Sequence, residues 1–341
     1  MAIKSVELKN FTVFEGLKID FSPGLNVIIG ENGTGKTHLL KTLYSFSGVT
    51  SDPCLFGAET DEGYFISSLT DCFGVAGCNE LIRKPSDCTE KPIMAVLHVH
   101  SDEGNCICEI KEASASCQLS NDNKLFPSIF IPSKDMLTHS RGLLTMAKKH
   151  SKDMPFDKTL LDIIKDAENW KVDETPTLTK NIAPLLEEVI GGKIVQKDGD
   201  FFVVKSNGEA IRFSCESEGV KKFGLLWQLL MATLIRNGSV LFWDEPEANL
   251  NPMLIPVVAE ILLELSRNGV QIFLATHDYM LAKSFEVKQL PNDLIRFHSL
   301  YKSHEGVKTE RNENFRDLKE NPIIVAYDKL LDEVIRLNLG D

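Results

Sequence analysis

The sequence predicts an α/β protein whose mixed sheet, flanked by helices, is interrupted by an inserted segment. An apolar run at 25–29 leads through a glycine-rich loop into a helical pattern, and strand, helix and strand patterns follow one another over 240–275. Between these regular parts the chain keeps no single period. We therefore expect one domain built from 1–50 and 200–341, with an inserted subdomain of a β-hairpin and helices at 51–199.

The composition is that of an ordinary globular chain, with 341 residues, 43% hydrophobic and 25% charged. The amino-terminal segment MAIKSVELKNF is strand-like, and no stretch approaches the ~20 consecutive apolar residues of a membrane span. These features favour a cytoplasmic protein with no membrane partner. The net charge of −12, from 37 basic and 49 acidic residues, argues against a dedicated nucleic-acid groove but leaves direct DNA binding open.

Seven of the eight cysteines fall between residues 54 and 117, and none forms a C-x-x-C pair. Cys106 and Cys108, with His98 and His100 nearby, match no standard zinc spacing. A metal site and reduced thiols in an ordinary cytosolic domain both stay open, and the spacing favours the thiols.

The first elements are strands. Residues 3–9 and 15–21 alternate apolar and polar side chains, which is typical of half-buried strands. Ser22-Pro23-Gly24 then turns the chain into the apolar run 25–29, which we predict to be a short buried strand.

The next segment fits the phosphate-loop pattern G-x-x-x-x-G-K-[ST], with Gly30, Glu31, Asn32, Gly33, Thr34, Gly35, Lys36 and Thr37. His38 continues a helical pattern that starts at Gly35 and runs to about residue 46. Glycines let backbone N–H groups close around phosphate oxygens, and the helix N-terminus adds positive potential. We expect the loop and His38 to bind ATP, Lys36 to reach the β- and γ-phosphates, and the Thr37 hydroxyl to coordinate Mg²⁺. A chance glycine-rich turn is the alternative, and the flanking strand and helix oppose it.

The middle of the chain is less regular, and its expected elements are separated by turn residues and prolines. We expect a partly helical stretch at 62–84, a hairpin of 93–100 and 106–111, a strand at 128–131, helices at 136–150, 157–169 and 178–190, and a hairpin of 193–197 and 201–205.

The carboxyl-terminal part is regular again, because apolar strands alternate with helical patterns. We expect a helix at 219–237, a strand at 240–243, a helix at 252–268, strands at 270–275 and 294–301, and an amphipathic closing helix at 323–337.

The strand at 240–243 ends in Asp244 and Glu245, which is the Walker B form. Asp244 would hold Mg²⁺, and Glu245 would polarise the attacking water as the general base. The alternative is an ordinary strand that ends in an acidic turn. The order of the motifs, with Asp244 lying 208 residues after Lys36, favours the nucleotide site.

Three further pieces follow the order of one family. Asn249–Pro252 has the place of a D-loop, and His277 closes the next predicted strand. Ser217 and Gly219 stand directly before the long helix, as a degenerate signature motif would. Singly, each piece could be a helix cap, a loop or a buried strand-end histidine. Together with the Walker motifs, they resemble the ATP-binding-cassette ATPases of the SMC, RecF and OLD group.

This resemblance implies a P-loop NTPase fold of the ATP-binding-cassette type and Mg²⁺-dependent ATP hydrolysis. It also implies a homodimer, or a higher homo-oligomer, that closes head-to-tail over ATP. In that arrangement His277 senses the γ-phosphate, while Ser217 and Gly219 complete the ATP site of the other subunit. The opening Val6–Phe14 is typical of this group, so Asn10 and Phe11 become candidates for contact with the base.

The chain departs from the larger members of the group. It has no long heptad-bearing coiled coil, no zinc-hook cysteine pair and no nuclease domain after the ATPase motifs. A Q-loop glutamine is not evident, and Gln118 is the nearest candidate. The intact LSGGQ signature of a transporter subunit is missing too, which disfavours that alternative. The Asp244-Glu245 pair disfavours a scaffold that binds ATP without turnover.

Residues 130–137 (FIPSKDML), with Asn321-Pro322-Ile323 and Tyr327, are similar to the short ATPases of bacterial anti-phage defence operons, such as the ATPase subunit of the phage anti-restriction-induced system. This similarity implies control of a separate effector, a nuclease or toxin from the same operon. The alternative is a RecF-like ATPase of DNA repair and recombination.

Overall fold

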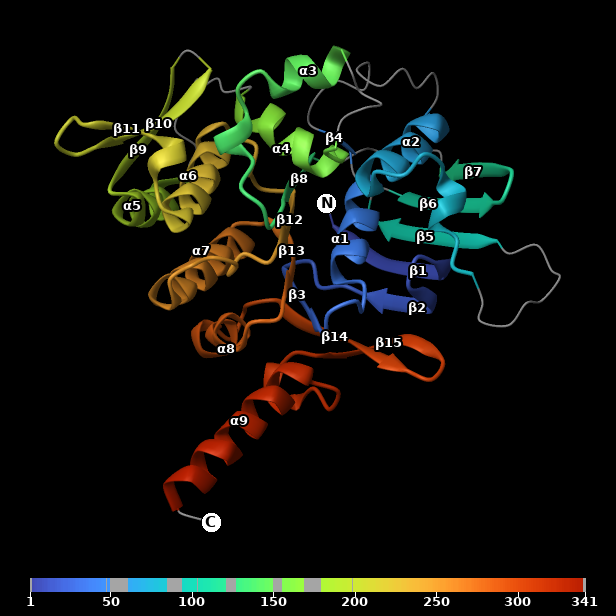
Figure 1. The fold of residues 1–341 in the computed structure, drawn as a ribbon. Helices are drawn as coiled ribbons and strands as arrows, with labels where there is room; N and C mark the ends of the chain where they lie inside the picture. Colours follow the sequence, from blue (N-terminus) through green and yellow to red (C-terminus); the bar gives the residue numbers. More distant parts are fainter. Residues whose placement is uncertain are drawn as a thin grey trace.

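The computed structural model describes residues 2–46, 48–49, 61–84, 94–102, 104–120, 127–149, 155–168, 179–197 and 199–339. A seven-stranded sheet runs through its centre (Figure 1), in the order β15-β14-β3-β13-β12-β8-β4. Neighbouring strands are parallel except β15, which pairs antiparallel with β14. This confirms the predicted mixed sheet. Its strands are β3 (Leu25–Gly30), β4 (Gly48–Val49), β8 (Pro127–Ile131), β12 (Val240–Asp244), β13 (Gln271–Thr276), β14 (Ile295–Ser303) and β15 (Gly306–Asn312).

The three strands β3, β12 and β13 are buried along their whole length, because helices or a second sheet cover both faces. Val27 and Ile29 belong to one hydrophobic cluster and Ile28 to another, so the two faces of β3 serve two cores. In Figure 1, α1 (Lys36–Ser45) lies on the side of the second sheet, and α6 (Glu218–Met231), α7 (Ile255–Arg267) and α8 (Tyr279–Lys288) lie on the opposite side.

The second sheet is antiparallel, with the order β2-β1-β5-β6-β7. Its strands are β1 (Ile3–Phe11), β2 (Phe14–Asp20), β5 (Ala95–Ser101), β6 (Gly104–Lys111) and β7 (Ser114–Leu119), and α2 (Asp61–Phe73) packs against α1 and β7.

This arrangement corrects the expected domain division. The strands β5 to β7 and β8 come from the segment 51–199, yet β5 pairs with β1 and β8 pairs with β12. Much of the supposed insertion therefore completes the two main sheets. The apolar pattern predicted β5, β6 and β8 but not β7, and it contained no information about their distant partners.

The remaining elements form a smaller layer beside α6. A three-stranded sheet has the order β11-β10-β9, and α5 packs against α6. These elements are α3 (Leu143–Lys149), α4 (Lys158–Glu168), α5 (Thr179–Ile190), β9 (Gly192–Lys197), β10 (Asp200–Lys205) and β11 (Ala210–Arg212).

The last helix, α9 (Pro322–Leu339), projects from the body (Figure 1). Ile323 is 8% exposed and Tyr327 stacks on Tyr279 of α8 at a centroid distance of 4.3 Å, whereas Leu330 is 59% exposed. Only the first part of α9 is therefore anchored. The helix expected to extend to Asn237 ends at Met231 instead. None of the helices in the described part of the chain has the length and apolar character needed to cross a bilayer.

Candidate functional site

The phosphate loop connects β3 to α1, and its shape depends on glycine. Gly30, Gly33 and Gly35 have φ angles of 153°, 76° and 91°, which residues with a Cβ rarely adopt. A Cβ at Gly30 would lie 2.4 Å from the carbonyl oxygen of Leu300, and one at Gly35 would lie 2.5 Å from Val13 Cγ2. The backbone can therefore curl into the cradle that a phosphate group requires.

Lys36 is buried at the base of this cradle, with 7% of its surface exposed. Its Nζ donates to the carbonyl oxygens of Gly30, at 2.8 Å, and Glu31, at 3.1 Å. Burial lowers the pKa of Lys36, and the carboxylates of the Walker B segment oppose this effect. A phosphate at the loop would offer the ammonium charged acceptors, which bind more strongly than carbonyl oxygens.

Thr37 and Asp244 meet although they are distant in sequence. The Thr37 hydroxyl lies 3.1 and 3.0 Å from the two carboxylate oxygens of Asp244. Burial raises the pKa of Asp244, so a bound cation would offset the cost of placing this carboxylate in the interior. A hydroxyl and a carboxylate beside a phosphate cradle are oxygen ligands that suit Mg²⁺.

Glu245 and His277 follow two neighbouring strands and lie together at the carboxyl edge of the sheet. Glu245 Oε1 is 3.4 Å from His277 Nδ1, and the side chains are 33% and 53% exposed. Glu245 has a left-handed φ of 49°, and its N–H donates to the carbonyl oxygen of Ala275 at 2.9 Å. Both predicted residues are therefore accessible beside Asp244, where a base and a phosphate sensor are needed.

A second glutamate, Glu247, braces this edge. Its Oε1 accepts from the Thr276 hydroxyl at 2.6 Å and from the His277 N–H at 3.3 Å. Burial raises the pKa of the carboxyl group. Glu247 thus ties the turn after β12 to the end of β13. Sequence reasoning missed it, although its place two residues after Glu245 was visible.

The signature residues lie at the start of α6. Ser217 caps the helix by accepting from the Val220 N–H at 3.4 Å, and it is exposed. Gly219 is buried, and a Cβ there would lie 3.2 Å from Leu254 Cδ1. Among the described residues, no hydrogen bond joins Ser217 to the loop Gly30–Thr37. Ser217 therefore makes no direct contribution to the phosphate cradle of its own chain.

The other predicted loop residues divide into two groups. Glu31 and Asn32 are exposed, whereas Thr34 is buried and its hydroxyl donates to the Glu31 carbonyl oxygen at 2.9 Å. The His38 ring packs against Phe73 with a centroid distance of 5.4 Å, and burial lowers its pKa. The His38 side chain is thus part of the packing beneath the loop, and only its backbone remains a candidate for contact with nucleotide.

The two candidates for base contact differ. Asn10 is partly exposed, has a φ of 49° and donates from its side chain to the Met94 carbonyl oxygen at 3.2 Å. Phe11 is 0% exposed and packs edge-on against Phe73. The expected contact of Phe11 with a base is therefore wrong for this conformation. Its apolar ring was needed in the core, as its place on the buried face of β1 requires.

Gln118 is also wrong as a Q-loop residue. It is exposed on β7, at the edge of the antiparallel sheet. The strand next to β12 on this side of the sheet is β8, whose last residue, Ile131, pairs with Trp243. The segment that leaves β8 at the edge of the sheet near the candidate site is therefore Pro132–Met136. Its residues are Pro, Ser, Lys, Asp and Met, so this edge carries no glutamine.

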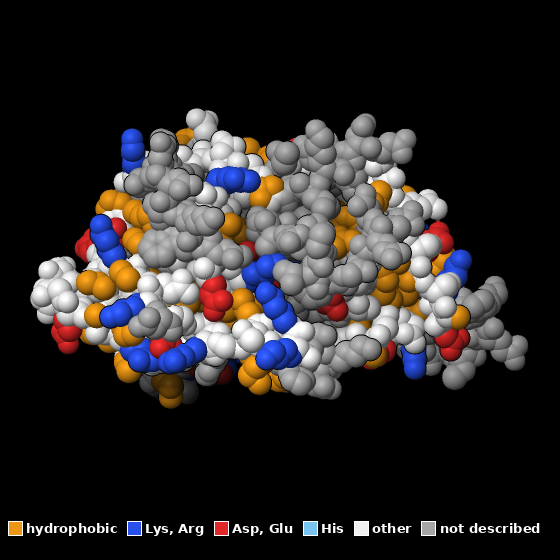
Figure 2. All heavy atoms as spheres, turned by 90° about the horizontal axis from the view of Figure 1, so that it is seen from above, with side chains coloured by type: hydrophobic (Ala, Val, Ile, Leu, Met, Phe, Trp, Pro, Cys, Tyr) orange, Lys and Arg blue, Asp and Glu red, His pale blue; other side chains and the backbone are white. Residues whose placement is uncertain are grey.

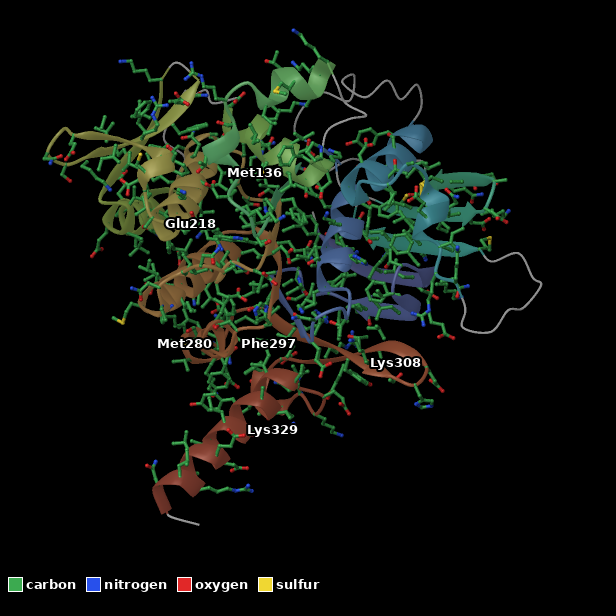
Figure 3. All side chains as sticks on the ribbon, viewed as in Figure 1. Met136, Glu218, Met280, Phe297, Lys308 and Lys329 are labelled. Carbon is green, nitrogen blue, oxygen red and sulfur yellow. A yellow bond between two sulfur atoms is a disulfide. The ribbon has the colours of Figure 1, made fainter. Side chains whose placement is uncertain are left out.

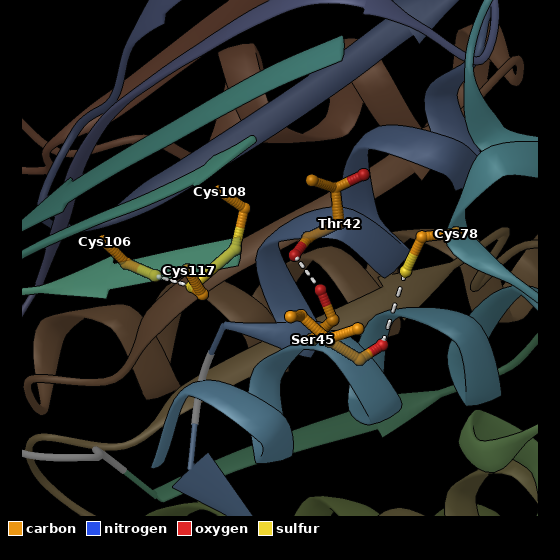
Figure 4. Close-up of a disulfide and its surroundings, with 7 residues drawn as sticks. Thr42, Ser45, Cys78, Cys106, Cys108 and Cys117 are labelled. Carbon is orange, nitrogen blue, oxygen red and sulfur yellow. Dashed lines mark hydrogen bonds between the residues drawn. A yellow bond between two sulfur atoms is a disulfide. The ribbon is translucent and has the colours of Figure 1, made fainter. Parts of the chain in front are cut away.

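A cluster of three cysteines lies on β6 and β7 (Figure 4). Cys108 and Cys117 form a disulfide, and Cys106 Sγ is 3.1 Å from Cys117 Sγ. This differs from the reduced thiols favoured by the spacing. Burial raises the pKa of Cys106 to about 12, so without a metal ion its thiol stays protonated at neutral pH. Cys54 and Cys88 lie outside the described residues.

Two family models match the chain. Residues 139–282 match a family described as "AAA domain, putative AbiEii toxin, Type IV TA system", and residues 1–65 match one described as "AAA ATPase domain". The matched segments contain the phosphate loop, the signature residues, the Walker B pair and His277.

SMC heads are among the solved structures with a similar fold. The SmcHead bound to the C-winged helix domain of ScpA has a TM-score of 0.61 and 15% identity, covering 93% of this chain and 100% of that one. The SMC head domain from Thermotoga maritima has a TM-score of 0.53 and 16% identity, covering 92% and 100%. At these identities the likeness shows the fold alone.

Curated relatives match over a short stretch. RecF of Heliobacterium modesticaldum is 46% identical over 48 residues, which are 14% of this chain and 13% of that protein. RecF of Lactococcus lactis strain IL1403 is 48% identical over 44 residues, 13% and 12%. An ATP/GTP phosphatase of Helicobacter pylori is 46% identical over 52 residues, 15% and 14%. The chain thus spans only a small part of these proteins. The matches to two AAA-family models and the likeness to SMC heads together show a P-loop ATPase fold.

Proposed function

We propose that this ATPase of the SMC, RecF and OLD group is a switch in which two copies close head-to-tail over two ATP molecules. One observation above all supports this proposal. The carboxyl edge of the central sheet brings together the phosphate cradle, Lys36, Thr37, Asp244 and Glu245, whereas Ser217 is exposed at the start of α6. A hydroxyl and an N–H group at a helix start suit an anion. A second copy would bring them to the phosphates that the first copy holds.

The geometry supports the following residue roles. The loop Gly30–Thr37 and the His38 backbone bind the phosphates, and Lys36 supplies positive charge. Thr37 and Asp244 would hold Mg²⁺, which would neutralise phosphate charge. Glu245 accepts a proton from the attacking water, and His277, 3.4 Å away, contacts the terminal phosphate. Asn10 remains the candidate for contact with the base.

The most direct test is Glu245→Gln. It keeps the size of the side chain but removes the base, so we expect hydrolysis to fall by about 10²- to 10⁴-fold while ATP binding is retained. Light scattering should then detect a dimer that persists with Mg²⁺ and ATP. Glu209→Gln, at an exposed turn, is the control and should behave as wild type. Unchanged hydrolysis in Glu245→Gln would refute the assigned base.

We further propose that the switch controls a separate effector, a nuclease or toxin, in anti-phage defence. The toxin–antitoxin description of the family that matches 139–282, and the segment FIPSKDML, support this role. Co-purification with the neighbouring gene product, with and without ATP, tests it. An ATP-dependent complex with an effector supports defence, and recovery of DNA without a protein partner contradicts it.

A RecF-like role in DNA repair is the second candidate, favoured by the local identity to RecF proteins. The net charge of −12 opposes it. In Figure 2, basic side chains on the described part of the visible face are interspersed with acidic and apolar ones. DNA-stimulated hydrolysis with a steep salt dependence would establish this alternative.

A further inference from the structure

We propose that Lys222 is a positioning residue that holds the backbone of Glu245. It thereby couples the helix α6, which Ser217 caps, to the proposed catalytic base of the same chain. This inference rests on the proposed role of Glu245. Lys222 lies on α6, within the turns that follow Ser217, and it contacts no phosphate-loop residue through any hydrogen bond among the described residues. Its effect on hydrolysis would therefore pass through Glu245.

The geometry connects the helix directly to the catalytic turn. Lys222 is 8% exposed, and its Nζ donates to the carbonyl oxygens of Glu245, at 3.1 Å, and Pro246, at 3.2 Å. The N–H of Glu245 donates to the carbonyl oxygen of Ala275 at 2.9 Å. The Glu245 peptide groups are thus held from α6 on one side and from β13 on the other.

This support matters because Glu245 has a φ of 49°. A left-handed backbone is unfavourable for a residue with a Cβ and persists where surrounding contacts hold it. If the ammonium of Lys222 is removed, two carbonyl groups lose a charged donor, and the turn can relax toward a commoner conformation. The Glu245 carboxylate would then leave its place beside His277.

The burial of Lys222 makes the contact sensitive to pH. Burial lowers the pKa of Lys222 to about 8, although Glu247 and Glu245 after β12, Glu218 on α6 and Asp244 at the end of β12 oppose the shift. No carboxylate among the described residues lies within ion-pair distance of its Nζ. The deprotonated amine would be a weaker donor to the two carbonyls, so the support for Glu245 should weaken as the pH rises through about 8.

The same helix carries the groups proposed to meet the other subunit's nucleotide. Ser217 caps α6, and Glu218, labelled in Figure 3, begins its first turn. A shift of this turn when Ser217 meets the partner's ATP would be passed to Glu245 through Lys222. Because such coupling is reciprocal, the state of each hydrolytic turn would also affect binding at the opposite site.

The adjacent Lys221 provides a matched control. It is likewise 8% exposed, but its Nζ pairs with Glu218 at 2.9 Å and Asp135 at 3.7 Å rather than with the catalytic turn. Substitution of either lysine by Met removes one buried ammonium from the same turn of the same helix. Only the substitution at position 222 should disturb Glu245.

We expect Lys222→Met to lower kcat by about 10- to 100-fold, as small displacements of catalytic groups do, with the Kd for ATP unchanged within roughly twofold. Lys222→Arg should restore part of kcat. Because guanidinium does not titrate in this range, Lys222→Arg should also keep its activity above the pH of about 8 where the wild type declines. Lys221→Met should retain wild-type kcat and the same decline.

The inference is overturned if Lys222→Met retains wild-type kcat, or if Lys221→Met and Lys222→Met lose kcat equally. It is also overturned if Lys222→Arg shows the same alkaline decline as the wild type. These outcomes are distinct from a failure of the proposed function, which would appear as undiminished hydrolysis in Glu245→Gln.

Discussion

At the scale of single residues, the site depends on contacts between positions that are far apart in sequence. Thr37 lies in the first turn of α1 and Asp244 ends β12, yet their oxygens lie 3.0 Å apart. The pair fits Mg²⁺ through its oxygen donors and through the buried carboxylate, whose pKa is raised by that burial. Loss of one charge at this position should therefore affect metal dependence more than folding.

Asp244→Asn keeps the shape of the side chain and removes its charge. We expect hydrolysis to fall on the order of 100-fold, and the Mg²⁺ concentration for half-maximal activity to rise, because one anionic oxygen ligand is lost. A Mg²⁺ titration of ATP hydrolysis measures both effects. Asp328→Asn, on the exposed part of α9, is the control. An unchanged Mg²⁺ requirement in Asp244→Asn would contradict the metal assignment.

Gly35 offers a test of the cradle itself. Its φ is 91°, and a Cβ would lie 2.5 Å from Val13 Cγ2 and 2.6 Å from Phe14 Cζ. Gly35→Ala should abolish detectable ATP binding and cost about 1–3 kcal/mol of unfolding free energy. Gly16→Ala, where no atom lies within 4 Å of the added Cβ, should change neither quantity. Calorimetry and urea unfolding provide the measurements, and normal ATP binding by Gly35→Ala would refute the steric argument.

At the scale of elements, the start of the helix α9 is buried against the body, whereas its later turns are exposed. Ile323 is 8% exposed and packs into the main core, whereas Leu330, two turns on, is 59% exposed. Ile323→Ala should cost about 2–4 kcal/mol of unfolding free energy, and Leu330→Ala should stay within about 0.5 kcal/mol. Urea unfolding of both variants checks this. Equal losses would mean that the outer part of α9 also packs in solution.

The strands and helices also show which parts of the fold could be predicted from the sequence and which could not. The phosphate loop and the Walker B strand were predictable because each motif is local and lies next to a buried strand. The pairing of β5 with β1 and of β8 with β12 was not, because periodicity reports the exposure of a strand and contains no information about its partner. That is why 51–199 was wrongly treated as a separate insertion.

The same reason explains the errors within the site. Phe11 was expected to contact the nucleotide base because of a family pattern. The alternation of buried and exposed residues along β1 instead places its ring in the core. Glu247 and Lys222 were missed because their roles depend on how the turn after β12 packs against β13 and α6. Such contacts between elements become visible only in three dimensions.

At the scale of the whole molecule, one copy would present two separate halves of the ATP site in the proposed dimer. The cradle is at the end of β3, and the exposed Ser217 is at the start of α6. A bulky residue at position 217 should leave ATP binding to a single copy intact, because Ser217 has no hydrogen bond to its own cradle among the described residues. It should prevent closure of the dimer.

Ser217→Arg should therefore bind ATP with wild-type affinity but remain monomeric and lose at least about 10²-fold in hydrolysis. Ser206→Arg, at an exposed turn between β10 and β11, carries the same change in charge and size and should behave as wild type. Sedimentation with Mg²⁺ and ATP distinguishes the two. Normal dimer formation by Ser217→Arg would contradict the assigned interface.

The central claim is that Ser217 of one copy completes the ATP site formed by Gly30–Thr37 of another. An experimental structure of Glu245→Gln with Mg²⁺ and ATP tests it most directly. We expect a head-to-tail dimer with each ATP held between the cradle of one copy and Ser217 and Gly219 of its partner. A monomer with bound ATP, or a dimer in which Ser217 faces away from both nucleotides, would contradict it.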